Sequence, residues 1–185
     1  YLDISSLALE GDEKKKTIFL NLETIRQRNI REARKDGASL TIESNVQPFL
    51  GYYKSLMLEQ GEEICSNKIH RMEHLLETLI DSKRAIMFFV RNKNGDVIYI
   101  TIFGLDQCRA YYLFGAGNPE RKERYLGTIA FWDAFKDLAK TRGITEIDLE
   151  GVNSPKRGWF KLSFGGDLRS YYQVYKRPKR ISDNA

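Results

Sequence analysis

Three charged side chains in the last third of the sequence are suited to moving a proton and to stabilising negative charge. Asp148 and Glu150 are two positions apart, so on one β-strand they would point to the same face, where one could take a proton from a bound amine. Lys161 has aromatic neighbours and precedes Gly165 and Gly166, a setting that suits a fixed cation. The structural alternatives are a surface lysine and two carboxylates that contact backbone or basic groups.

Tyrosines near the C-terminal end are further candidate proton donors. Tyr171, Tyr172 and Tyr175 fall in an alternating stretch, and Tyr171 is included among the candidate catalytic residues. Alternating tyrosines on a strand more commonly serve packing.

A second motif indicates a different chemistry. His70 to His74 reads H-x-x-E-H, in which two histidines one helical turn apart bind zinc and a glutamate acts as base. The same helix carries its apolar residues on the other side, and the sequence has no other histidine. We therefore assign no metal site.

Composition favours one folded domain. The chain has 185 residues, 42% apolar and 30% charged, which excludes disordered and fibrous classes. No stretch resembles a membrane span or a signal peptide. Cys65 and Cys108 are too few for a disulfide scaffold, which favours a reducing, cytoplasmic setting. Because residue 1 is not Met, we expect the chain to be part of a longer protein.

The net charge of +5 is unevenly distributed. Residues 117–185 hold 14 basic and 9 acidic groups, so the whole surplus lies there. Such a surplus attracts phosphates on a nucleotide, an RNA or a membrane surface, although many basic clusters are only solvated surface. Two stretches are the candidates for these contacts: Arg26, Arg28, Arg31, Arg34 and Lys35, and the tail with Lys176, Arg177, Lys179 and Arg180.

Hydrophobic periodicity and turn residues predict an α/β chain with a mixed sheet. The predicted helices cover residues 21–36, 46–58, 69–80, 128–142 and 154–164. The predicted strands cover residues 38–43, 85–90, 97–103, 110–114, 144–149 and 170–175. Strands 85–114 form an antiparallel meander, whereas the helical crossover at 128–142 makes strand 144–149 parallel to strand 110–114. Such a pair diverges beyond its carboxyl ends and leaves a crevice for a ligand.

This order of elements and four local stretches resemble the FemABX-like peptidyltransferases, a branch of the GNAT acyltransferase superfamily. The stretches are residues 28–37, 111–116, 148–153 and 159–166, and the most specific feature is Phe-Lys followed by Phe-Gly-Gly in the last of them. The resemblance implies a GNAT-like domain over residues 21–176, with a lead-in segment at 1–20 and a basic tail at 177–185. It also implies a second GNAT-like domain upstream, this one being the C-terminal copy.

The resemblance assigns roles near the predicted crevice. Lys161 would face the donor and stabilise negative charge on it or on the developing oxyanion, and Phe160 would line the same site. The donor would run along Phe114, Gly115 and Ala116.

A phosphate-binding loop is implied at residues 121–128. Arg124 and Gly127 match the family pattern, and Thr128 completes the loop. Ile129 departs from the pattern, which argues against close approach of a coenzyme A pyrophosphate.

The implied function is an acyl- or aminoacyltransferase that forms an amide on an amine in peptidoglycan assembly, in the cytoplasm at the inner face of the membrane. The donor co-substrate would be aminoacyl-tRNA or acyl-CoA, with no permanently bound cofactor, and the acceptor an amine-bearing envelope precursor. One alternative is a CoA-dependent N-acyltransferase acting on an amino sugar or amino acid. Another is a non-catalytic domain that positions substrate or binds RNA.

Overall fold

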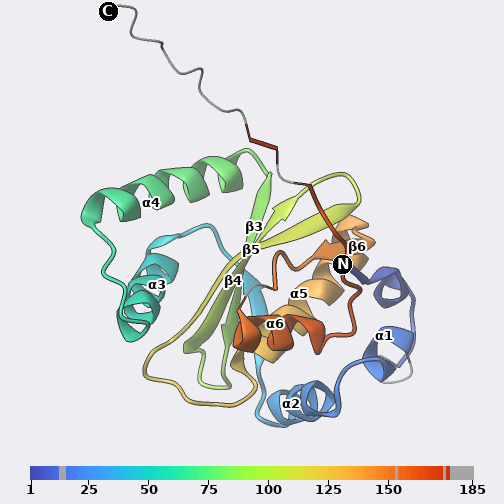
Figure 1. Cartoon of the computed structure of the whole chain (residues 1–185). Helices are drawn as coiled ribbons and strands as arrows, with labels where there is room; N and C mark the ends of the chain where they lie inside the picture. Colours follow the sequence, from blue (N-terminus) through green and yellow to red (C-terminus); the bar gives the residue numbers. More distant parts are fainter. Residues whose placement is uncertain (13–15, 153, 173, 176–185) are drawn as a thin grey trace, which may run out of the picture.

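The computed structural model describes residues 1–12, 16–152, 154–172 and 174–175, without the side chain of residue 156. In this part of the chain a six-stranded mixed sheet is covered by helices on both faces (Figure 1). The strand order is β1-β6-β5-β4-β3-β2. The strands are β1 (Leu2–Asp3), β2 (Ser39–Ile42), β3 (Ala85–Arg91), β4 (Val97–Leu105), β5 (Arg109–Gly117) and β6 (Glu146–Asp148).

Only the β5–β6 pair is parallel within the described sheet; all other neighbours are antiparallel. The predicted meander and parallel pair are therefore confirmed. The hairpin turn at residues 92–95 joins β3 to β4, and Gly95 adopts a φ of +86° that glycine tolerates well.

The continuous apolar run of β3 is explained by burial on both faces. Phe88 belongs to the core that contains α2 and α5, and its neighbour Phe89 belongs to the core formed with α3 and α4. The helices are η1 (Ser5–Ala8), α1 (Thr17–Leu20), α2 (Thr24–Lys35), α3 (Gln47–Glu59), α4 (Ser66–Asp81), α5 (Leu126–Arg142) and α6 (Pro155–Leu162). All five predicted helices are present, and α5 ends at Gly143 in the left-handed conformation.

The lead-in segment contributes to the fold. Ile4, Leu7 and Phe19 are almost completely buried in the core around α5. The two residues of β1 pair with β6, as Leu2 with Ile147 and Asp3 with Glu146. The lead-in is thus packed against the sheet, and the domain boundary at residue 20 stays a prediction.

The strand predicted at residues 170–175 is wrong for the described part of that range, where no strand forms. Tyr172 and Val174 are 97% and 93% exposed. The reason is competition for the edge of the sheet, because β1 occupies the free side of β6. An alternating pattern alone does not provide a partner strand. The basic tail from Lys176 lies outside the described residues.

Candidate functional site

The parallel strands β5 and β6 diverge as predicted. They pair at three positions, from Arg109 with Glu146 to Tyr111 with Asp148. Beyond this point β5 continues along β4 to Gly117, whereas β6 ends. A bulge leaves Leu113 without a partner in the β4–β5 register, which bends β5 where the strands separate.

A cavity of about 850 Å³ lies at this divergence, and we call it the aromatic cavity. Its walls come from α3 on one face of the sheet and from α5 and α6 on the other. Six aromatic rings line it, with two cations, one carboxylate and one amide among the remaining side chains. The lining residues are Tyr53, Leu56, Met57, Gln60, Tyr99, Tyr112, Leu113, Phe114, Gly115, Gly127, Phe131, Glu150, Arg157, Phe160 and Lys161.

A second cavity of about 410 Å³, here called the outer cavity, adjoins it on the side of β6. The lining residues are Tyr1, Asp148, Leu149, Glu150, Gly151, Val152, Lys161, Leu162, Gly166, Asp167, Leu168, Arg169 and Tyr171. Lys161 and Glu150 line both cavities. These two residues therefore mark the boundary between the cavities.

Lys161 is held at this boundary by α6. Its Nζ donates a hydrogen bond to the carbonyl oxygen of Gly151 at 2.9 Å and lies 5.4 Å from the centroid of the Tyr112 ring. Burial lowers the pKa of Lys161, the positive charge of Arg157 lowers it further, and the negative charge of Glu150 acts in the opposite direction. The ammonium group is thus directed into the site rather than into bulk solvent.

The two candidate carboxylates lie together, but not on one strand face as predicted. β6 ends at Asp148, and Glu150 has a φ of +64°. The Glu150 N–H donates to Asp148 Oδ1 at 2.8 Å, so a tight turn replaces the extended strand. The strand ends here because β5 has already diverged and offers no further partner. Burial, and then the charge of Asp148, raise the pKa of Glu150.

The fourth catalytic candidate, Tyr171, lies in the outer cavity with 73% of its surface exposed. All four catalytic candidates therefore line the outer cavity.

Four of the seven donor-binding candidates line the aromatic cavity: Phe114, Gly115, Gly127 and Phe160. The other three line neither cavity. Ala116 is buried in the core with α3 and α4. The buried Thr128 hydroxyl accepts hydrogen bonds from Arg26 at 2.8 Å and from Asn29 at 3.3 Å. Arg124 is exposed.

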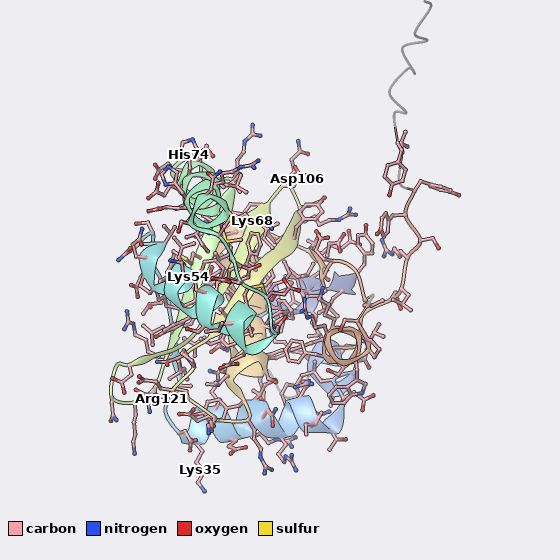
Figure 2. The ribbon with its side chains drawn as sticks, turned by 60° about the vertical axis from the view of Figure 1, so that its left-hand side comes forward. Lys35, Lys54, Lys68, His74, Asp106 and Arg121 are labelled. Atoms are coloured by element: carbon pink, nitrogen blue, oxygen red, sulfur yellow. The ribbon has the colours of Figure 1, made fainter. Side chains whose placement is uncertain are left out.

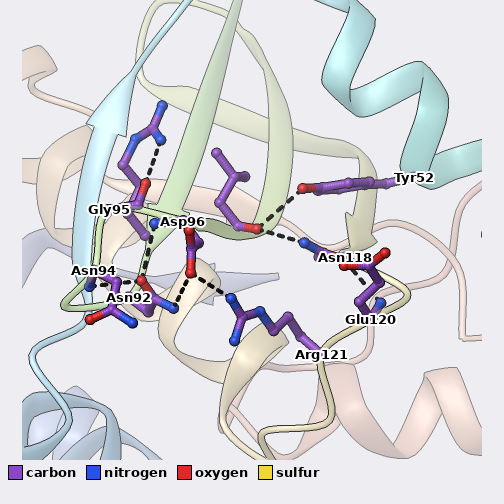
Figure 3. Close-up of polar contacts among 10 residues, drawn as sticks. Tyr52, Asn92, Asn94, Gly95, Asp96, Asn118, Glu120 and Arg121 are labelled. Carbon is purple, nitrogen blue, oxygen red and sulfur yellow. Dashed lines mark hydrogen bonds and ion pairs between the residues drawn. The ribbon is translucent and has the colours of Figure 1, made fainter.

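The implied phosphate loop is partly engaged in other contacts (Figure 3). Arg121 Nη2 lies 2.5 Å from Asp96 Oδ2, which ties the loop to the β3–β4 hairpin. Asn118 donates to the Val97 carbonyl oxygen, which also accepts from the Tyr52 hydroxyl of α3. These contacts hold the segment between β5 and α5 in place.

The N-terminus of α5 reaches the aromatic cavity through Gly127. Its N-cap residue, Tyr125, makes no side-chain cap hydrogen bond. A Cβ on Gly127 would lie 3.3 Å from Phe160 Cζ, so the glycine allows α6 to pack closely. The positive end of a 17-residue helix therefore faces the cavity beside Phe160.

The double glycine after α6 is a packing feature rather than a flexible segment. Gly165 has a φ of +82°, and a Cβ there would lie 2.9 Å from the Asn21 carbonyl oxygen. A Cβ on Gly166 would lie 2.7 Å from the Tyr1 carbonyl oxygen. Both glycines allow the segment after Lys161 to approach neighbouring backbone closely.

Sequence reasoning missed several residues of the site. Tyr99 and Tyr112 look like ordinary strand aromatics, and Arg157 looks like a surface cation, yet all three line the aromatic cavity.

Arg26 was expected on a basic surface helix but is 5% exposed, and its Nε donates to Ser163 Oγ at 2.7 Å. The only indication in the sequence was the spacing: Arg26 is four residues before Ile30, so both side chains lie on the same, inner face of the helix.

The H-x-x-E-H motif does not gather a metal site among the described residues, where no three His, Cys, Asp or Glu side chains cluster. It lies on α4, and the side chain of His70 is 80% exposed. His74 lies on the outer side of that helix (Figure 2), and it lines neither cavity. Within the described chain, no helix combines the length and apolar character needed to cross a bilayer.

No family model and no curated protein matches the sequence. Solved structures match in three dimensions. A possible acetyltransferase from Clostridium difficile 630 has a TM-score of 0.60 and 9% identity, over 76% of this chain and 97% of its own. A predicted acetyltransferase from Clostridium acetobutylicum with acetyl-CoA has a TM-score of 0.58 and 12% identity, over 75% and 96%. FemX has a TM-score of 0.67 and 13% identity, over 87% of this chain and 56% of FemX.

These identities are too low to show more than the fold. The described part of this chain contributes to that likeness a mixed sheet with one parallel pair and helices on both faces. The chain therefore has the GNAT acetyltransferase fold, the architecture that the resemblance implied.

Proposed function

We propose that this chain is an acyltransferase that forms an amide bond on an amine. The observation that carries the proposal is that Lys161 and Glu150 line both cavities. An acyl donor in the aromatic cavity and an amine in the outer cavity would meet at these two side chains. The fold shared with acetyltransferases supports acyl transfer as the class of reaction.

The reaction follows from the charges at this boundary. The neutral amine attacks the carbonyl carbon of the donor, a C–N bond forms, and the carbonyl oxygen becomes an oxyanion. The Lys161 ammonium stabilises that negative charge electrostatically. Glu150 accepts the proton that the attacking nitrogen loses and delivers it to the departing thiol or hydroxyl as the bond to the leaving group breaks.

We propose the FemABX-like branch, with an aminoacyl donor and an amine-bearing cell-envelope precursor as acceptor at the inner face of the membrane. Lys161, after Phe160 and before the closely packed Gly165 and Gly166, supports this choice because these residues carry the resemblance. The chain spans 56% of FemX, which is compatible with a second GNAT-like domain upstream.

An acyl-CoA donor is the second candidate. One observation favours it: the uncapped N-terminus of α5 opens on the aromatic cavity at Gly127, where its dipole would attract a pyrophosphate. Two observations count against it: the Arg121 guanidinium is already paired with Asp96, and Ile129 departs from the family pattern of the implied loop.

Calorimetry with acetyl-CoA and with a non-hydrolysable aminoacyl-tRNA analogue separates the two donors. We expect the tRNA analogue to bind and the Lys161→Ala variant to bind it more weakly. Tight binding of acetyl-CoA alone, lost in Gly127→Val where a side chain would enter the cavity, would favour the second candidate. Binding of neither, with no amide product from either donor, would contradict the proposed function.

The Asp148→Asn variant tests Glu150 as the base. A base acts when deprotonated, so kcat/KM should fall as pH drops through the Glu150 pKa, which burial and Asp148 hold above its usual 4.5. Removing the like charge lowers that pKa, so the acid limb of the profile should move to lower pH. The asparagine Oδ1 can still accept the Glu150 N–H, which preserves the turn.

The measurement is the pH profile of kcat/KM for the wild type, Asp148→Asn and Glu150→Gln. Glu150→Gln should abolish the acid limb. An unchanged limb in both variants would show that another group accepts the proton.

A further inference from the structure

Two phenol hydroxyls meet inside the aromatic cavity. Tyr99 of β4 and Tyr112 of β5 both line it, and their hydroxyl oxygens lie side by side next to the backbone of Gly115. Burial raises the pKa of both phenols, so each hydroxyl keeps its proton and can donate one hydrogen bond.

The Tyr112 side chain lines the cavity, with the Tyr99 hydroxyl beside its own hydroxyl. Burial raises the pKa of Tyr112 to about 12, and the nearby charge of Arg157 limits the rise. Tyr112 therefore stays protonated at neutral pH. Its hydroxyl is a neutral hydrogen-bond donor on the wall of the cavity.

The backbone makes room for these hydroxyls at Gly115. A Cβ there would lie 2.8 Å from the Tyr112 hydroxyl oxygen and 2.9 Å from that of Tyr99. The φ of Gly115 is not in the left-handed region, so backbone conformation does not require a glycine. The reason for the glycine is space for the hydroxyl pair beside β5.

Packing against neighbouring rings fixes the position of the Tyr112 ring. The ring packs against Phe131, with centroids 4.7 Å apart, and against Phe103 at 5.9 Å. The Lys161 ammonium lies 5.4 Å from its centroid. The cation and the phenol thus border the same small volume, in an orientation fixed before any ligand enters.

We propose that the Tyr112 hydroxyl binds the carbonyl oxygen of the transferred acyl group and stabilises the oxyanion, with Tyr99 as a positioning residue. This rests on the acyl transfer proposed above. As the C–N bond forms, the electron pair of the C=O bond moves to oxygen, which accepts a hydrogen bond from Tyr112. Tyr112 keeps its proton throughout, and collapse of the intermediate expels the leaving group, which takes the amine proton through Glu150.

Tyrosine-to-phenylalanine variants test this proposal because they remove only the hydroxyls. With whichever donor the wild type consumes, we expect Tyr112→Phe to lower kcat about 100-fold with little change in KM, as for loss of one oxyanion donor. Tyr99→Phe should lower kcat about 10-fold, since Tyr112 keeps its hydroxyl but loses the neighbouring Tyr99 hydroxyl that positions it. The double variant should be no slower than Tyr112→Phe alone.

Tyr52→Phe is the matched control. The Tyr52 hydroxyl donates a hydrogen bond to the Val97 carbonyl oxygen (Figure 3), and Tyr52 lines neither cavity. It should retain wild-type kcat, and all variants should keep the wild-type unfolding midpoint within a few degrees.

Three results would overturn the proposal. Wild-type kcat in Tyr112→Phe, with an active wild type, would refute the role of Tyr112 alone. Multiplicative losses in the double variant would refute the action of Tyr99 through Tyr112. A wild type that consumes neither donor would remove the proposed function itself, and this inference with it.

Discussion

Replacing Lys161 with alanine should lower kcat about 100-fold, the loss typical of removing one electrostatic stabiliser of an oxyanion. The ammonium group is placed at the boundary of the two cavities by its 2.9 Å hydrogen bond to Gly151 and its position over Tyr112. On the substrate, negative charge appears only as the carbonyl oxygen becomes an oxyanion in the transition state. The effect should therefore appear in kcat more than in KM.

Steady-state kinetics on Lys161→Ala and Lys54→Ala make the comparison. Lys54 lies on the exposed side of α3 and away from both cavities, so its variant should be as active as the wild type (Figure 2). Circular dichroism should show both variants folded. Full activity of Lys161→Ala would assign Lys161 to ordinary surface and favour a domain that only positions substrate.

Replacing Phe164 with alanine should destabilise the fold by about 3–5 kcal/mol, the usual cost of truncating a large buried aromatic. Phe164 is completely buried. Its ring stacks on Phe131 at 5.5 Å and meets Phe135 and Phe160 edge-on at 5.6 and 5.4 Å. It therefore anchors the end of α6, the helix that carries Lys161.

Urea unfolding monitored by circular dichroism measures this loss. The control is Trp159→Ala on the same helix, because the Trp159 side chain is 55% exposed and mainly stacks on Arg26 at 5.0 Å. We expect the control to lose about 1 kcal/mol or less, in line with an exposed cation–π contact. Equal losses in the two variants would mean that Phe164 does not anchor α6 as described.

The central strands of the sheet could be predicted from the sequence because the residues that specify them are close together in the chain. The hairpin at residues 92–95 and the apolar runs beside it specify β3 and β4 through neighbouring residues. The helical crossover then required β6 to be parallel to β5. The edge strand of the sheet could not be predicted from the sequence. It forms because Leu2 pairs with Ile147, two residues far apart in the sequence, and no local pattern indicates which segment pairs with the free side of β6.

The residues of the candidate site also fall into those that the sequence identified and those that it did not. Lys161 and Phe160 were identified from a short motif, and both line the aromatic cavity. Glu150 was identified for a wrong geometric reason, since it reaches Asp148 through a turn at positive φ rather than along a strand. Tyr112 was missed as a site residue, because its hydroxyl becomes distinctive only when Tyr99 and Gly115 are brought against it.

The sequence by itself determined the kinds of element and their order, because hydrophobic periodicity and turn residues act within a few positions. It also marked Lys161 as a chemical candidate. Only the tertiary structure decided that Lys161 and Glu150 face two cavities at once, and that Arg26 turns inward to Ser163 and Thr128. The physical reason is that burial, desolvation and hydrogen-bond partners are set by segments distant in sequence, which the local residue pattern does not specify.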